Sequence, residues 1–321
     1  MGRTKIEWCD AVWNPVRGCS RVSEGCRNCY AERMAARFCG PGRPFEGFAY
    51  CSPIGPKWTG AVRLIEDKLE EPLRWRKPRR VFVNSMSDLF HEAIADRDIA
   101  AVFGVMAACP QHTFLVLTKR AKRMQEWARN QSGAPLAGTL NHFWTLRQRA
   151  EAVGVVFPAS EHQDAECSWT GWPLSNVWLG VSCEDQKTAD ERIPLLTETP
   201  AAHRFVSYEP ALGRIDFTRR LPWSMLDEID WLVFGGESGP QARLCNIEWA
   251  RSARAQCRKA GTAFFMKQAG SRPFVAIPEV VANAPSLDVC PLPQMLVSLK
   301  HPKGGDPSEW PADLRVREVP W

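Results

Sequence analysis

The stretch FLVLTKRAKRMQEWAR, residues 114–129, contains the unit from which the fold is built. It begins with a continuous apolar run, turns polar at Thr118 and Lys119, and continues as a basic segment with the character of a helix. An apolar run without alternation is typical of a strand that is buried on both faces of a parallel sheet. The stretch therefore predicts a strand, a polar strand end and a helix in succession.

The same order of strand, polar end and helix recurs along the chain. Further strands are predicted at residues 11–16, 81–84, 177–182, 203–210, 230–238 and 262–268. Further helices are predicted at residues 96–108, 186–196 and 247–259. Six or seven such units favour an α/β fold, a partial or full β/α barrel of the TIM type. A doubly wound open sheet is the alternative.

Two segments interrupt this order. Residues 131–176 contain Gly, Pro, His and Trp without clear periodicity, and we expect an insertion there. Residues 271–321 are rich in Pro and in charged side chains, which favours an irregular C-terminal extension. The expected organisation is a barrel over residues 1–270 with the insertion at 131–176, followed by the extension.

The composition is that of an ordinary soluble protein, with 45% hydrophobic residues among 321. No apolar stretch reaches the roughly 18–20 residues of a membrane span. The first residues lack the apolar core of a signal peptide, so we expect a cytoplasmic protein without a membrane partner. Its net charge of +5 permits a nucleic-acid partner. In a reducing compartment the 12 cysteines do not indicate disulfides.

Polar side chains follow every predicted strand. In a β/α barrel the carboxyl ends of the strands meet at one mouth, where the active site lies. The alternative is that strand ends are simply where polar residues begin. The candidate residues at these ends are Asn84, Ser85, Asp88, Thr118, Lys119, Ser182, Glu184, Glu209, Gly235, Gly236, Glu237, Lys267 and Gln268.

Three cysteines after the first predicted strand stand closer together than the others. Cys19, Cys26 and Cys29 have the spacing C-x6-C-x2-C. Three thiolates on one loop can hold three irons of a 4Fe–4S cluster and leave the fourth iron open. A structural zinc site is one alternative, and it would need a fourth ligand such as Cys9 or Cys39. Buried free thiols are the other alternative.

The chain resembles the phage-associated three-Cys-motif family, which is similar to the radical S-adenosylmethionine (SAM) enzymes. The resemblance covers nearly the whole chain. It is carried by IEWCDAVWNPVRGCSRVSEGCRNCYAERMA at 6–35, VFVNSMSDLFHE at 81–92, FVSYEP at 205–210, FGGESG at 234–239 and HPKGGDPSEWPADLRVRE at 301–318. Two features depart from the radical SAM pattern. The first cysteine gap is three residues longer than usual, and the Gly-Gly-Glu triplet is at 235–237 instead of after the second strand.

The resemblance implies a radical SAM enzyme with a 4Fe–4S cluster on the three cysteines. SAM would bind the open iron, and an external electron donor would drive its cleavage to a 5′-deoxyadenosyl radical. The resemblance places Asp88 at the SAM ammonium, and Ser182 and Glu184 at the ribose hydroxyls. Asn84, Ser85, Glu209 and Glu237 are further candidates at the same mouth.

Three functions are compatible with these features. The first is an enzyme that acts on nucleic acid, by base repair such as a DNA photoproduct lyase reaction or by base modification. It is favoured by the basic and aromatic stretches at 74–80 and 119–123, and by a resemblance in architecture to spore photoproduct lyase. The second is a radical SAM enzyme that acts on a peptide or small molecule. The third is a non-catalytic cluster-binding or zinc-binding protein that works with a partner protein.

Overall fold

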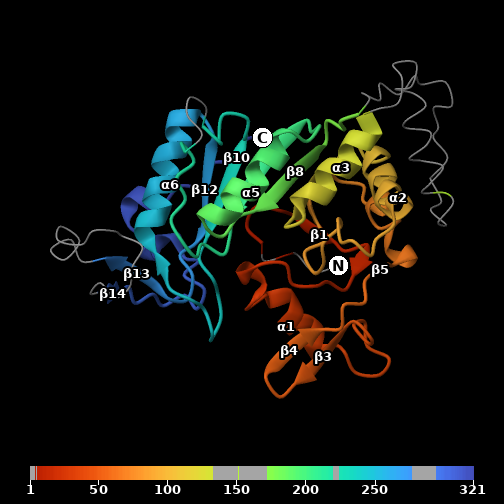
Figure 1. Cartoon of the computed structure of the whole chain (residues 1–321), viewed down its shortest axis with the longest axis horizontal. Coiled ribbons are helices and arrows are strands. Elements are labelled where there is room, and N and C mark those ends of the chain that lie inside the picture. The colour runs from red at the N-terminus through yellow and green to blue at the C-terminus, as the bar shows by residue number, and fades with distance from the viewer. Residues whose placement is uncertain (1–3, 5, 133–150, 152–171, 220–223, 277–293) are drawn as a thin grey trace. The chain divides into compact units, whose positions relative to one another are not determined.

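The main element of the computed structural model is a seven-stranded parallel sheet (Figure 1). Its strands, in spatial order, are β1 (Ala11–Trp13), β6 (Arg80–Val83), β7 (Thr113–Thr118), β8 (Val177–Ser182), β9 (His203–Tyr208), β10 (Trp231–Gly235) and β12 (Ala263–Gln268). The spatial order never departs from the chain order, whereas a doubly wound sheet reverses direction at a switch point. The fold is therefore α/β of the partial TIM-barrel type, and the doubly wound alternative is wrong.

The structure describes residues 4, 6–132, 151, 172–219, 224–276 and 294–321. Within these ranges every strand predicted for the main sheet is present. The predicted helices are α2 (Asp96–Ala107), α3 (Ala121–Ser132), α5 (Gln186–Thr197) and α6 (Ile247–Ala260). Helix α6 shows how local sequence sets such bounds: the Asn246 side chain accepts from the Glu248 amide at 3.0 Å, and Gly261 ends the helix at φ 77°.

The smaller elements were largely missed from the sequence, because they are short. They comprise the helix α1 (Tyr30–Arg37), the hairpin β3 (Ala49–Ser52) and β4 (Gly55–Trp58), the pair β2 (Val16–Arg17) and β5 (Arg63–Leu64), and the small sheet β11 (Cys245–Asn246), β13 (Pro273–Ala276) and β14 (Gln294–Leu296). Single 3₁₀ turns are η1 (Glu24–Cys26), η2 (Glu66–Lys68), η3 (Pro72–Arg74), η5 (Pro307–Glu309) and η6 (Ala312–Leu314).

The chain divides into two compact units. Unit 1 comprises residues 1–180 and 195–203. Its core includes the aromatic contact between Phe103 on α2 and Trp127 on α3, whose ring centroids are 4.5 Å apart. Trp13 on β1 is fully buried and donates its indole N–H to the Lys68 carbonyl at 2.6 Å. This hydrogen bond satisfies the polar atom that burial of an indole would otherwise leave unpaired.

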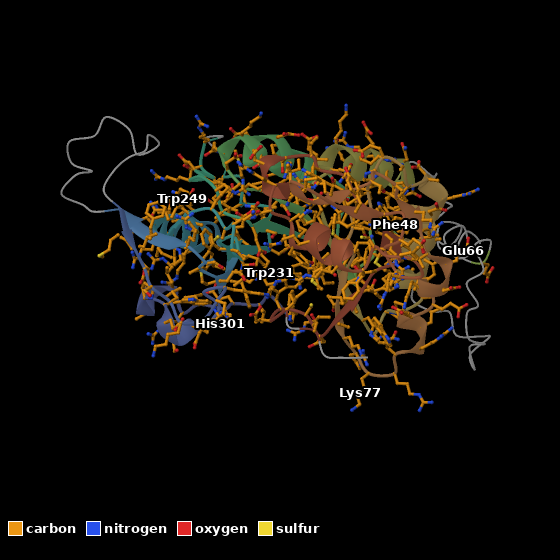
Figure 2. All side chains as sticks on the ribbon, turned by 90° about the horizontal axis from the view of Figure 1, so that it is seen from below. Phe48, Glu66, Lys77, Trp231, Trp249 and His301 are labelled. Carbon is orange, nitrogen blue, oxygen red and sulfur yellow. The ribbon has the colours of Figure 1, made fainter. Side chains whose placement is uncertain are left out.

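Unit 2 comprises residues 181–194 and 204–321. Its core is organised around Trp231 on β10, which is labelled in Figure 2. The indole contacts Phe205, Phe265 and Trp321 in edge or tilted geometry, and its N–H donates to the Glu318 carbonyl at 2.9 Å. Residues close to the end of the chain thus complete the packing around β10 and β12.

The structure describes only part of the predicted insertion and of the predicted C-terminal extension. The insertion at 131–176 lies almost wholly outside the described residues. The extension at 271–321 contains β13, β14, η5 and η6, and the division at residue 270 stays a prediction. No helix among the described residues is long and apolar enough to span a bilayer.

Candidate functional site

The cysteine loop begins at Gly18, directly after β2. Gly18 has φ 87° and forms a parallel bridge with Ser87, which follows β6. A Cβ at this position would overlap the carbonyl oxygen of Ala61 and lie 2.9 Å from the ring of Phe48, which is labelled in Figure 2. Only glycine fits this backbone conformation and this space, so the start of the loop has one fixed path.

Cys26 and Cys29 are placed by two helical turns. Cys26 is the last residue of η1, and Cys29 is the residue that precedes the first turn of α1. Burial raises the pKa of Cys29, and the backbone N–H groups of Glu32 and Ala31 oppose this rise. The positive end of a helix favours negative charge, so it favours the thiolate form that a metal centre requires.

Cys19 lies within electrostatic range of both other thiols. Burial raises the pKa of Cys19 to about 12, Asp88, Cys29 and Cys26 act in the same direction, and Arg120 opposes them. At neutral pH this thiol therefore carries its proton, which a metal centre would have to displace. Among the described side chains, no three from His, Cys, Asp and Glu are grouped closely enough to hold a single metal ion.

The two cysteines considered as a fourth zinc ligand are engaged elsewhere. Cys39 follows the opposite end of α1, about 12 Å of helix from Cys29. Its Sγ lies 3.0 Å from the carbonyl oxygen of Ala36. Cys9 is buried, with its Sγ 4.0 Å from the carbonyl oxygen of Ile6. The local donor set is thus three thiols, one fewer than a closed zinc site needs.

Asp88 is buried in unit 1 and joins the ends of β6 and β7. Its Oδ1 accepts from the Phe90 amide at 3.0 Å and from the Thr118 hydroxyl at 2.7 Å. Its Oδ2 accepts from the Lys119 amide at 3.1 Å and from the Arg120 guanidinium at 3.2 Å. Both carboxylate oxygens therefore have protein partners, and Asp88 positions the ends of these two strands.

Arg120 connects these strand ends to the cysteine loop. Its side chain is only 4% exposed. Besides Asp88, it donates to Glu92 at 2.9 Å and to the Ser20 hydroxyl at 2.8 Å. The guanidinium thus carries a buried positive charge to the residue that follows Cys19, where a cluster bound by thiolates would be anionic.

Asn84, at the end of β6, combines two unusual features. It has φ 58° without being glycine, and its side chain is buried. Its Oδ1 accepts from the Val16 amide at 3.3 Å, which fixes the orientation of the amide. The Nδ2 atom has no hydrogen-bond partner among the described residues. An orphaned buried donor on a residue with rare backbone geometry marks a candidate ligand contact.

Ser85 contacts one residue that precedes the cysteine loop in the sequence and one that follows it. Its hydroxyl donates to the Asn14 side chain at 3.2 Å, and its carbonyl oxygen accepts from the Tyr30 hydroxyl. Tyr30 is the first residue of α1 and directly follows Cys29. The end of β6 is therefore tied to the helix that Cys29 begins.

The remaining predicted site residues lie in unit 2. Glu184 is 1% exposed, and both of its oxygens lie 3.2 Å from Nη1 of Arg192. The same Nη1 donates to the Ser182 carbonyl at 2.7 Å. This arginine therefore organises the end of β8 as Arg120 organises the ends of β6 and β7.

Glu209 and Lys267 form an ion pair at the ends of β9 and β12. The Lys267 Nζ lies 2.7 and 2.6 Å from the two Glu209 oxygens, and both side chains are about one-fifth exposed. A Cβ on Gly235 would approach the Glu209 carboxyl carbon to 3.0 Å. Gly235 therefore makes room for this carboxylate.

Glu237 is paired inside its own turn. It accepts from the Arg243 amide at 2.8 Å and from the Arg243 guanidinium at 2.7 Å. A Cβ on Gly236 would overlap the carbonyl oxygen of Ala269. The Gly-Gly-Glu triplet thus has a packing role that explains both glycines.

Several side chains of the basic stretches are committed to ion pairs. In 119–123, Arg120 is buried and Arg123 pairs with Asp96. In 74–80, Arg74 pairs with Glu70 at 2.7 Å, and Arg80 pairs with Asp10 at 2.8 Å. Lys77, labelled in Figure 2, is exposed.

The chain belongs to a family of proteins of unknown function, DUF5131, whose model matches residues 3–285. The match spans most of the chain. No curated protein and no solved structure is significantly similar to it.

Sequence reasoning missed Ser20 and the role of Arg120. Arg120 was interpreted as part of a basic surface, whereas the structure buries it beside Asp88. The available signal was its position immediately after the polar end of a predicted strand. Ser20 had no signal beyond its adjacency to Cys19.

Proposed function

We propose that this protein is a radical SAM-type iron–sulfur enzyme. The observation that carries the proposal is a set of three thiols on one loop, after the first strand of a partial TIM-type barrel. The resemblance to the phage-associated three-Cys-motif family supports the same assignment.

In this proposal Cys19, Cys26 and Cys29 hold a 4Fe–4S cluster. When bound, the cluster supplies the electron for reductive cleavage of SAM. Helix α1 favours thiolate at Cys29, and Arg120 places positive charge beside Cys19. Asn84 offers its unpaired amide to an acceptor oxygen of the ligand. Further candidates for contacts to SAM or substrate are Ser85, Asp88, Ser182, Glu184, Glu209 and Glu237.

The proposed substrate is nucleic acid, on which the enzyme repairs or modifies a base. Its support is the net charge of +5 and exposed basic residues such as Lys77. An external electron donor in the cytosol would supply the reductant. A peptide or small molecule is the second substrate class, and a partner-dependent binding protein is the non-enzymatic alternative.

The first experiment tests the cluster. Anaerobically purified protein, reconstituted with ferrous iron and sulfide, is expected to contain about four irons and four sulfides per chain. Cys26→Ala should lose most of the cluster. Cys257→Ala is the matched control, because that thiol is buried on α6 in unit 2. Iron-free protein with one zinc per chain would contradict the proposal.

The second experiment separates the substrate classes. Reduced, reconstituted protein is incubated with SAM, with and without DNA or RNA oligonucleotides, and 5′-deoxyadenosine is quantified. Stimulation by an oligonucleotide supports the nucleic-acid proposal. Formation that no oligonucleotide increases favours the second substrate class. No product with an intact cluster favours the binding protein.

A further inference from the structure

The hydroxyl of Ser20 is held between two buried side chains. The Nη2 atom of Arg120 lies 2.8 Å from Ser20 Oγ and also donates to the Ser20 carbonyl at 3.2 Å. The Nε2 atom of His91 lies 2.8 Å from the same Oγ. Arg120 and His91 are buried, each 6% exposed as a whole residue, whereas Ser20 is half-buried.

Both neighbours donate to Ser20. A guanidinium has no acceptor, so Arg120 can only donate. The Ala93 amide donates to Nδ1 of His91 at 3.1 Å, which requires that this nitrogen carries no proton. A neutral imidazole then carries its proton on Nε2, and the contact with Ser20 is a donation from His91.

The two donations use both acceptor positions of the hydroxyl oxygen. A serine hydroxyl has two lone pairs and one proton. Its own hydrogen therefore points in a third direction, and it meets no protein acceptor in the described part of the chain. The residue before it is Cys19, whose Sγ lies 3.5 Å from the Ser20 carbonyl oxygen, so the hydroxyl belongs to the residue that this thiol contacts.

We propose that Ser20 donates its hydroxyl hydrogen to a sulfur atom of the cysteine site once the cluster is bound there. Ser20 is then a positioning residue that sets the reduction potential of the cluster, and Arg120 and His91 fix its direction. Hydrogen bonds to the sulfurs stabilise the more negative, reduced state, so they raise the potential. This inference rests on the proposed function, because it assumes that a cluster is bound.

The test measures the midpoint potential of the reconstituted cluster in four proteins. These are the wild type, Ser20→Ala, Ser20→Thr and Ser52→Ala. Ser20→Thr retains the hydroxyl. Ser52→Ala is the matched control, because that hydroxyl donates to Gly55 within the β3–β4 hairpin at 2.7 Å. Iron and sulfide content and the thermal midpoint of each apo-protein are measured in parallel.

We expect Ser20→Ala to shift the midpoint potential to more negative values at unchanged iron content. Ser20→Thr should restore most of the shift, and Ser52→Ala should leave the potential at the wild-type value. Equal potentials in Ser20→Ala and the wild type, both with full clusters, would overturn the inference and leave the proposed function intact. Loss of the cluster in Ser20→Ala with retention in Ser20→Thr supports the inference, provided that the apo-proteins melt alike. Absence of any cluster from the wild type would overturn both proposals.

Discussion

The guanidinium of Arg120 donates to the Asp88 carboxylate at 3.2 Å, and both side chains are less than one-tenth exposed. Arg120 also reaches Ser20 in the cysteine loop. One buried charge pair therefore fixes the ends of β6 and β7 and the residue next to Cys19. We therefore expect substitution of Arg120 or Asp88 to alter the cysteine loop even though neither residue is a cysteine.

Replacement of Arg120 by methionine should destabilise unit 1 strongly. The variant leaves the Asp88 carboxylate buried without its cationic partner, which typically costs about 3–5 kcal/mol. Urea unfolding of the apo-protein measures the loss. Lys122→Met is the control, because Lys122 and Glu126 form an exposed pair at 3.9 Å and should contribute at most about 1 kcal/mol. Similar losses in the two variants would contradict the role of Arg120.

Replacement of Gly18 by alanine should lower the stability by more than the penalty for its positive φ alone. Gly42 is the matched control, since it has φ 69° but no heavy atom within 4 Å of an added Cβ. Gly42→Ala should therefore cost about 1 kcal/mol, the usual penalty for positive φ. Gly18→Ala adds the clash with Ala61, which typically costs a further 1–3 kcal/mol.

Thermal unfolding and iron content check the glycine prediction. We expect Gly18→Ala to melt at a lower temperature than Gly42→Ala and to retain less iron after reconstitution. Equal melting temperatures would show that the loop adapts to the added methyl group.

The barrel strands were predictable because each is a continuous apolar run with a polar end. Strand β7, predicted at 114–119 and observed at Thr113–Thr118, illustrates this agreement. The hairpin β3–β4 was not predictable, because its residues are half exposed and Gly55-Pro56 interrupts any period. Its place is set by tertiary contacts, including the Trp58 amide that donates to Glu32 on α1 at 3.0 Å.

The residues of the site could be predicted from the sequence, but the ion pairs that they form could not. The spacing of Cys19, Cys26 and Cys29 marked the loop, and the strand ends marked Asp88 and Glu184. Nothing in the sequence showed that each of these two carboxylates faces an arginine: Arg120, directly before α3, and Arg192, in the middle of α5. Such pairing depends on which side chains the sheet brings together, and spacing along the chain does not reveal it.

Replacement of Asn84 by glycine should separate ligand binding from folding. Glycine accepts the left-handed backbone of this position without strain, but the buried Val16 amide loses its acceptor, so the stability should fall by about 1–3 kcal/mol. The variant loses the orphaned Nδ2 donor, and we expect the affinity for SAM to fall at least about tenfold, or about 1.4 kcal/mol. Calorimetric titration of the reconstituted protein with SAM measures this affinity.

Asn246→Gly is the control for Asn84→Gly. Asn246 caps helix α6, where glycine costs only a few tenths of a kcal/mol. Its affinity for SAM should equal that of the wild type. An unchanged affinity in Asn84→Gly would remove Asn84 from the ligand site.

His112 should make the stability of unit 1 depend on pH. Burial lowers the pKa of His112 below its ordinary value of 6.5. Its Nε2 lies 3.3 Å from the Pro72 carbonyl oxygen, whereas Nδ1 has no partner among the described residues. Burial of the charged imidazolium, followed by the nearby charge of Arg79, therefore outweighs the backbone hydrogen bonds to Pro72 and Trp75 that favour the protonated form.

The sign of the pH effect follows from this shift. Above about pH 6.5 the imidazole is neutral in both states and the stability is complete. As the pH falls below the unfolded-state pKa, the unfolded chain binds the proton more readily, so the free energy of unfolding decreases. The decrease continues until the pH reaches the lower pKa of the folded state. Urea unfolding between pH 8 and pH 5 should show this loss in the wild type.

His112→Gln should weaken this dependence, because glutamine can donate to the Pro72 carbonyl and carries no titrating group. A residual slope should remain, since burial also lowers the pKa of His91 below its ordinary value. His203→Gln is the control, because its imidazole stacks on Trp178 at a half-exposed position, with ring centroids 4.4 Å apart. If His112→Gln and the wild type lose the same stability between pH 8 and pH 5, burial of His112 does not cause the pH dependence of unit 1.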